Sequence, residues 1–149
     1  MITFQVEKIK DIKAEALPLL QAHWEEIALN KDSVPLDPDW DGYVNVEAAG
    51  LLHIITARDD SKLIGYAAYF ITPNLHYRSL REANSDIFYL SPEHRKGLTG
   101  LKLMKAAEVE LKAIGVNKII NKVKKHFDLG PLFERIGYKA FETHYAKLV

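Results

Sequence analysis

Residues Asp86–Met104, with the sequence DIFYLSPEHRKGLTGLKLM, decide the fold. A short apolar run ends at Leu90, a turn with a basic pair and two glycines follows, and an amphipathic helix begins at about Gly100. Backbone N–H groups converge in such a turn, and the helix N-terminus adds partial positive charge. This unit is therefore predicted to bind a phosphate, with Arg95 and Lys96 adding positive charge. The alternative is a plain connection with solvated basic side chains, because a turn with two glycines is a weak signal by itself.

The segments on either side predict a mixed α/β domain. Strands are expected at Thr3–Ile9, Leu51–Ala57, Leu63–Thr72, Ser85–Leu90, Lys118–Lys122 and Tyr138–Val149. Helices are expected at Leu17–Asn30, Trp40–Ala48, Gly100–Ile114 and Pro131–Ile136, the first with Pro18 in its first turn. The turn Arg58–Lys62 makes an antiparallel hairpin, in which Gly65 marks a bulge. This order predicts a mixed, mostly antiparallel central sheet with helices on both faces.

Length and composition exclude several classes of protein. The 149 residues suit a single domain, 1–149, and the net charge of zero gives no overall basic field for nucleic acid. The absence of cysteine excludes disulfides and thiolate catalysis. No signal peptide and no membrane-spanning run is recognised, so we expect a cytoplasmic protein that does not enter a membrane.

Two motifs resemble those of the GNAT acetyltransferases. The family signature Arg/Gln-x-x-Gly-x-Gly/Ala is matched by Arg95, Thr99 and Gly100, with Leu98 at the first glycine position and Gly97 one residue early. The segment LFERIGY, 132–138, is similar to the family's Leu-Tyr-Glu-x-Leu-Gly-Phe/Tyr. The resemblance covers nearly the whole chain, and the shifted turn is similar to that of small phage-encoded members.

The resemblance implies an acyl-CoA acyltransferase fold with a splayed pair of parallel strands, one ending at Leu90 and one starting near Lys118. It implies that acetyl-CoA is the co-substrate and that its pantetheine arm lies in the opening. The Leu90 amide would then polarise the thioester carbonyl. The positions implied to bind acetyl-CoA are Phe88, Tyr89, Leu90, Arg95, Lys96, Gly97, Leu98, Thr99, Gly100, His126 and Phe133.

Acetyl transfer also requires groups that move protons. Candidate bases are Asp86, which strand alternation places on one face with Phe88 and Leu90, and Glu142 in the last strand. Each is equally explained as a solvated carboxylate. The family's tyrosine acid is replaced by Phe133, which leaves Tyr138 as a candidate acid or simply a packing residue. The other substitutes for the acid are Tyr145, His144 and His126.

The acceptor is expected to be a small-molecule or peptide amine. Acidic and aromatic residues suit a cationic amine, and the candidate lining is His23, Glu25, Glu26, Asp37, Asp39, Trp40, Tyr43, His76 and Tyr77. No His or carboxylate pattern predicts a metal site.

The function predicted first is acetyl-CoA-dependent N-acetyltransfer, directly to an amine. The alternative is a degenerate acyl-CoA-binding regulatory or interaction module without turnover, for which Leu98 and Phe133 are the indications. A nucleic-acid surface at Lys118–Lys125 is not favoured, because no stacking aromatics are interleaved. The long last strand would leave an exposed sheet edge, or one that a second subunit covers in a homodimer.

Overall fold

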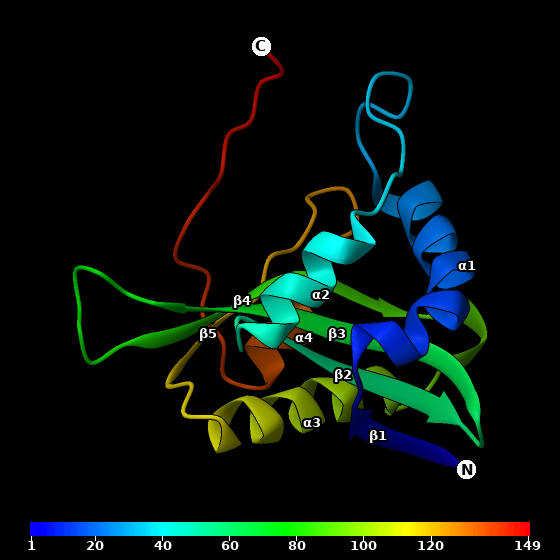
Figure 1. Ribbon diagram of the computed structural model, residues 1–149, viewed down its shortest axis with the longest axis horizontal. Helices are drawn as coiled ribbons and strands as arrows, with labels where there is room; N and C mark the ends of the chain where they lie inside the picture. Colours follow the sequence, from blue (N-terminus) through cyan, green and yellow to red (C-terminus); the bar gives the residue numbers. More distant parts are fainter.

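The computed structural model describes residues 1–149, which form one five-stranded sheet with helices on both faces (Figure 1). The strands, in sheet order, are β1 (Ile2–Val6), β2 (Leu52–Asp59), β3 (Lys62–Pro73), β4 (Arg81–Leu90) and β5 (Lys118–Ile120). The helices are α1 (Ile9–Ile27), α2 (Trp40–Ala48), α3 (Thr99–Ala113) and α4 (Gly130–Arg135), with a 3₁₀ turn η1 at Pro92–His94. All neighbouring strands are antiparallel except the parallel pair β4 and β5. The predicted fold class is confirmed.

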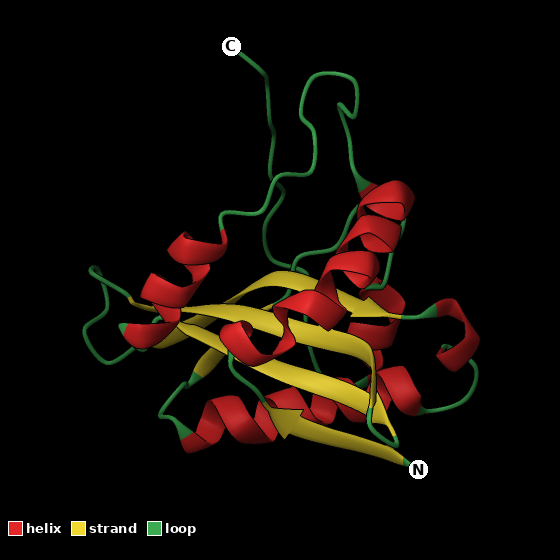
Figure 2. Cartoon of the chain, turned by 45° about the vertical axis from the view of Figure 1, so that its right-hand side comes forward, coloured by secondary structure: helices red, strands yellow, loops and turns green.

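Two apolar clusters hold the layers together. On one face, α3 packs Leu103, Ala107 and Leu111 against the sheet, with all three side chains buried. On the other face, α1 packs Ile9 and Ile12 against the sheet, and α2 closes the same cluster. Figure 2 shows the sheet between these helical layers.

The first helix begins earlier than predicted, at Ile9 instead of Leu17, so Pro18 lies inside it. A proline inside a helix costs roughly 3 kcal/mol. Burial of Ile9 and Ile12 against β2 and β3 contributes about 1.5–3 kcal/mol per side chain, which together offsets that cost. Packing on the sheet therefore decides where this helix begins.

Strand β4 also begins earlier than predicted, at Arg81 instead of Ser85, and it pairs with β3 along its whole length. The bulge expected near Gly65 is present, because the β2–β3 register shifts so that Ile64 has no partner on β2. Gly65 itself lies against β4, where an added Cβ would be 2.5 Å from the Tyr89 carbonyl oxygen.

The predicted strand Tyr138–Val149 is wrong. Residues 138–149 form no strand, and the segment leaves the sheet and ends away from it (Figure 1). Its apolar side chains Phe141, Tyr145 and Leu148 are exposed. Strand propensity alone is insufficient here because no neighbouring strand pairs with this segment.

No helix of the protein has the length and apolar character needed to cross a membrane.

Candidate active site

The carboxyl-terminal half of β4 has an open edge. Strand β5 pairs with β4 only over Glu82–Asn84, and the residues from Asp86 to Leu90 lie beyond this pairing. Ser91 N donates to Ile64 O at 2.8 Å, so by alternation the backbone groups of Phe88 and Leu90 face away from β3. The structure thus contains the splayed parallel pair. Its opening receives the backbone N–H and C=O of Phe88 and the Leu90 N–H, whereas the Leu90 carbonyl accepts a hydrogen bond from Arg95 Nε.

A bulge changes the direction of Asp86. The β3–β4 register passes from Ala68↔Ile87 to Tyr69↔Ser85, which leaves Asp86 as an extra residue on β4. Asp86 and Ile87 therefore both face α1 and α2, whereas Phe88 and Leu90 face α3. The prediction that Asp86 shares a face with Phe88 and Leu90 is wrong, because strand alternation fails at a bulge.

Asp86 is held by a tyrosine of α2. The Tyr43 hydroxyl donates to Asp86 Oδ2 at 2.9 Å, and the Tyr43 ring stacks on Phe70 of β3. One side of the Asp86 carboxyl is open to solvent, but protein surrounds the rest, and this burial raises its pKa above the ordinary value. The hydrogen bond from Tyr43 and the charge of Lys122 oppose that rise. Asp86 is therefore a carboxylate of raised basicity, and its hydrogen bond with Tyr43 fixes its orientation.

The turn after β4 presents unpaired backbone amides. Gly97 has a φ of +83°, a conformation suited to glycine, and Leu98 caps α3 without a side-chain hydrogen bond. A Cβ added to Gly100 would meet no atom closer than Leu90 Cδ2 at 3.9 Å, so the first turn of α3 is open. Lys96 is exposed and forms no ion pair. These features fit a pyrophosphate.

Arg95 has a different environment from the one expected of a phosphate-binding residue. Its Nη2 contacts both carboxylate oxygens of Glu26, at 2.7 and 2.9 Å, and its Nε donates to Leu90 O at 2.7 Å. The guanidinium also lies between the rings of Tyr89 and Phe127, 5.3 and 5.6 Å from their centroids. Arg95 thus joins the end of α1 to the end of β4, and Glu26 neutralises its charge.

The remaining predicted residues of the cofactor site lie around α4. The His126 Nε2 is 3.1 Å from Ile27 O, which links the loop before α4 to the end of α1. Phe133 is buried and packs edge-on against Tyr138, with ring centroids 5.4 Å apart. Burial and the neighbouring Glu108 carboxylate raise the pKa of Tyr138, which lies beside α3 on the face opposite Asp86. The structure does not bring Tyr138 to Asp86.

Glu142 lies in the exposed C-terminal segment. Its Oε2 is 3.4 Å from His144 Nε2, and no residue of the sheet holds its carboxylate. The segment therefore provides no fixed geometry for Glu142.

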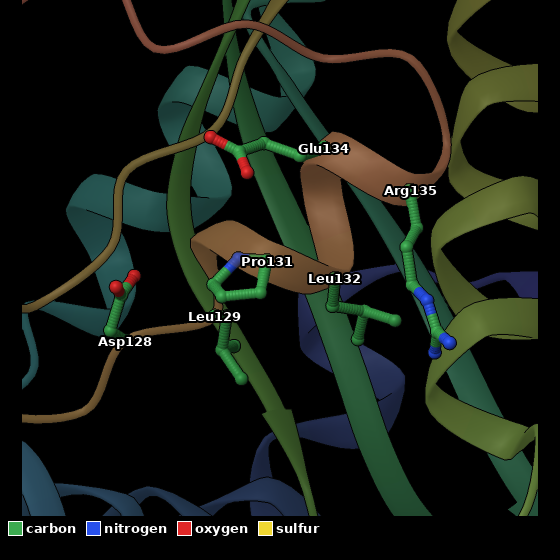
Figure 3. Close-up of a pocket in the computed structure, with 6 residues that line it drawn as sticks. All are labelled: Asp128, Leu129, Pro131, Leu132, Glu134 and Arg135. Carbon is green, nitrogen blue, oxygen red and sulfur yellow. The ribbon is translucent and has the colours of Figure 1, made fainter.

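An open hollow of about 710 Å³ lies along α4 (Figure 3). Leu132 and Arg135 extend from α4, and Arg135 points toward α3. No residue from Asp86 to Leu90 lines the hollow, so it lies outside the region around the β4 edge. The lining residues are Asp128, Leu129, Pro131, Leu132, Glu134 and Arg135.

The sequence interpretation missed Tyr66 of β3, which is buried beside His23 and Tyr89. Its signal was weak, because a tyrosine in an apolar strand usually serves packing. No group of His, Asp and Glu side chains that could hold a metal ion is present.

The chain is similar in sequence to a known protein family and in structure to several solved proteins. Residues 14–138 match the model of the acetyltransferase (GNAT) family. The structure superposes on a transcriptional regulator from Bacillus halodurans C-125 with a TM-score of 0.78 at 18% identity, covering 100% of both chains. No curated protein sequence matches the chain.

Two further solved structures are similar. A predicted acetyltransferase with acetyl-CoA from Clostridium acetobutylicum gives a TM-score of 0.74 at 20% identity, covering 100% of this chain and 96% of its own. A ribosomal-protein-alanine N-acetyltransferase from Brucella melitensis biovar Abortus 2308 gives 0.73 at 18% identity, covering 100% and 99%. At these identities, the likeness shows a shared fold.

Proposed function

The chain belongs to the acetyltransferase (GNAT) family, and on that premise we propose that it transfers an acetyl group from acetyl-CoA directly to an amine. The observation that carries the proposal is the open edge of β4 between Asp86 and Leu90, which ends at a turn with unpaired amides. The backbone groups along this edge and in this turn can hydrogen-bond the thioester arm and the phosphates of one acetyl-CoA molecule. The proposed chemistry requires no metal.

The residues proposed to bind acetyl-CoA act mainly through backbone groups. The edge of β4 at Phe88 and Leu90 would hydrogen-bond the pantetheine arm, and the Leu90 N–H would stabilise charge on the thioester oxygen. The turn Lys96–Gly100 would hold the pyrophosphate through its amides and the Lys96 charge. Arg95 would hold the turn in position and would not bind the phosphates itself, since Glu26 already neutralises its guanidinium.

Asp86 is the proposed base. The amine nitrogen would form a bond to the acetyl carbon while the carbon–sulfur bond breaks, and CoA would leave as the thiolate. Asp86 would receive the proton that the amine loses. Its position on the α1 and α2 face, fixed by Tyr43, favours an acceptor that enters from that face. The chain contains no cysteine to carry the acetyl group, which supports direct transfer.

The deciding experiment measures acetyl-CoA binding and turnover separately. We expect acetyl-CoA to raise the melting temperature, with a dissociation constant of about 1 mM or tighter. CoA release is then followed with a panel of amines: glucosamine, alanine amide, spermidine and n-butylamine. Acetylation of any amine supports transfer. Binding without turnover across a wide panel would instead favour the acyl-CoA-binding module, and absence of binding would overturn both.

A substitution at the turn tests the phosphate assignment. Gly100→Glu places a carboxylate at the open first turn of α3, so we expect acetyl-CoA affinity to fall by about tenfold or more through like-charge repulsion. Val109→Glu is the matched control, because it adds the same charge at an exposed position farther along α3. Equal affinity in both variants would contradict the assignment.

A further inference from the structure

The pairing of β4 with β5 ends after three residues. The last backbone pair is Asn84 with Ile120, and the next two residues of the chain, Asn121 and Lys122, form no backbone–backbone hydrogen bond. Backbone N–H groups that leave a sheet in this way need another acceptor, because an unpaired polar group away from water is costly. Contacts other than strand pairing therefore hold the chain after β5.

Two neighbouring hydroxyls of the sheet provide these contacts. Lys122 N donates to Ser85 Oγ at 2.8 Å, and the Tyr69 hydroxyl donates to Asn121 Oδ1 at 2.9 Å. Ser85 and Tyr69 are paired across β3 and β4, and they are only 5% and 2% exposed. Two buried side chains on adjacent strands thus hold two consecutive residues at the start of the segment 121–127.

The segment 121–127 lies beside the open edge of β4. It starts at Ser85, which directly precedes the bulge in β4. It ends at Phe127, whose ring centroid is 5.6 Å from Arg95 Cζ, and Arg95 Nε in turn donates to Leu90 O. The segment therefore passes from the start of the open edge to its end at Leu90 and forms the second side of the opening.

The rest of this segment has few other contacts. Residues 122–127 are all exposed. After Lys122, the hydrogen bond between His126 Nε2 and Ile27 O is the only one that joins the segment to another element. Removal of either buried hydroxyl should therefore loosen the end of the segment that follows β5.

We propose that Ser85 and Tyr69 are positioning residues for acetyl-CoA, because their hydroxyls keep the segment 121–127 in place beside the β4 edge where the pantetheine arm binds. A segment that is ordered before the ligand arrives loses less conformational entropy on binding, so affinity rises. Neither side chain would touch the cofactor; each acts through the chain after β5. This inference rests on the proposed function and adds side-chain determinants of affinity to a site built mainly from backbone groups.

The test measures binding of two probes to wild type, Ser85→Ala and Tyr69→Phe by isothermal titration calorimetry. Acetyl-CoA has the pantetheine arm, whereas ADP has the diphosphate without the arm. We expect each substitution to weaken acetyl-CoA binding three- to tenfold, because one hydrogen bond that holds the segment is lost. Affinity for ADP should not change, because the turn Lys96–Gly100 is left intact. Equal weakening for both probes, or a folded variant with unchanged acetyl-CoA affinity, would overturn the proposal.

Thr56→Val is the matched control. Thr56 is 0% exposed and its hydroxyl donates to Gln5 O at 3.1 Å, so valine also removes a buried hydrogen bond, but between β1 and β2. Thr56→Val should bind both probes as wild type does. A loss of acetyl-CoA affinity as large as that in Ser85→Ala would show an effect of stability alone and overturn the proposal. Amide hydrogen exchange at Lys122 should be faster in Ser85→Ala than in wild type, and unchanged exchange there would also overturn it.

Failure of the proposed function can be distinguished from failure of this inference. The readout is acetyl-CoA binding, so the test does not require turnover. If wild type and both variants bind acetyl-CoA equally well, the proposed function stands and this inference fails. If wild type does not bind acetyl-CoA, the proposed function fails and this inference fails with it.

Discussion

At the scale of single residues, the environments of two titratable side chains link stability to function. Asp86 lies on the face of the sheet covered by α1 and α2, and His23 projects from α1 toward Tyr66 and Tyr89 of the same face. Burial disfavours the charged form of each side chain. The pKa of Asp86 is therefore raised, whereas that of His23 is lowered to about 4. Because the two pKa values are shifted in opposite directions, the pH dependence of activity tests Asp86 and the pH dependence of stability tests His23.

Asp86→Asn should separate activity from stability. As the proposed base, Asp86 acts only when ionised, so kcat/KM should fall as pH decreases through its raised pKa, above the ordinary value of about 3.9. Asp86→Asn should lower kcat by about 10²-fold or more. Because a raised carboxyl pKa contributes stability at low pH that is lost as pH rises, Asp86→Asn should unfold no more easily at pH 7.

The matched control is Asp11→Asn, which removes an exposed carboxylate from the first turn of α1 and should leave kcat unchanged. Full activity of Asp86→Asn would assign proton removal to water or to the acceptor.

His23 should make the protein less stable in mild acid. Between its ordinary pKa of 6.5 and the folded value of about 4, the unfolded chain binds a proton that the folded chain does not. Stability should therefore fall as pH decreases through this window, by about 2 kcal/mol between pH 7 and pH 5.

His23→Leu should remove that part of the pH dependence in urea unfolding. The pKa of His53 is also lowered, but it contributes equally to both proteins and cancels in the comparison. Parallel stability curves for wild type and His23→Leu would contradict the assignment.

At the scale of elements, the contact between β3 and β4 determines where the open edge lies. Gly65 lets the β4 backbone approach closely, since an added Cβ would lie 2.5 Å from Tyr89 O and 3.1 Å from Leu90 Cα. The bulge at Asp86 and the short β5 determine which side chains and backbone groups flank the opening. The geometry of the proposed site is therefore a property of strand pairing more than of single side chains.

Gly65→Ala should displace the end of β4. Overpacking should cost about 1–3 kcal/mol in urea unfolding, and kcat should fall in the folded protein because Leu90 moves. Gly50→Ala is the control: Gly50 has a φ of +74° in the turn before β2, so alanine there costs about 1 kcal/mol and leaves β4 in place. An equal loss of kcat in both variants would show an effect of stability alone.

At the scale of the whole molecule, the C-terminal segment contributes little to the packed structure. Residues 139–149 are exposed throughout, and the sheet and its two helical layers are complete before them. The ring centroid of Phe141 lies 5.3 Å from Lys118 Nζ of β5. Stability therefore resides in residues before this segment.

Deletion of residues 142–149 should change the free energy of unfolding by less than about 0.5 kcal/mol, because no buried group is lost. Urea unfolding of the full and shortened chains measures this difference. The mass in solution should be the same for both chains. A dimer that dissociates on deletion would show that the exposed Tyr145 and Leu148 cover a sheet edge in a second subunit.

The sequence alone determined the layered α/β fold, the strand, turn and helix unit after Asp86, and the family resemblance. These are local features, because turn chemistry and apolar periodicity act over a few residues. The start of α1 was not predictable in this way, since Pro18 argues against a helix interior and only packing on β2 and β3 outweighs it.

Tertiary structure alone decided the direction of Asp86, the pairing of Arg95 with Glu26, and the absence of a last strand. The bulge depends on how β4 matches β3, the ion pair joins residues far apart in the chain, and a strand needs a partner to form. Tyr66 belongs to the same group. Its position in an apolar strand predicts burial, but whether a buried hydroxyl has a partner depends on every element packed around it.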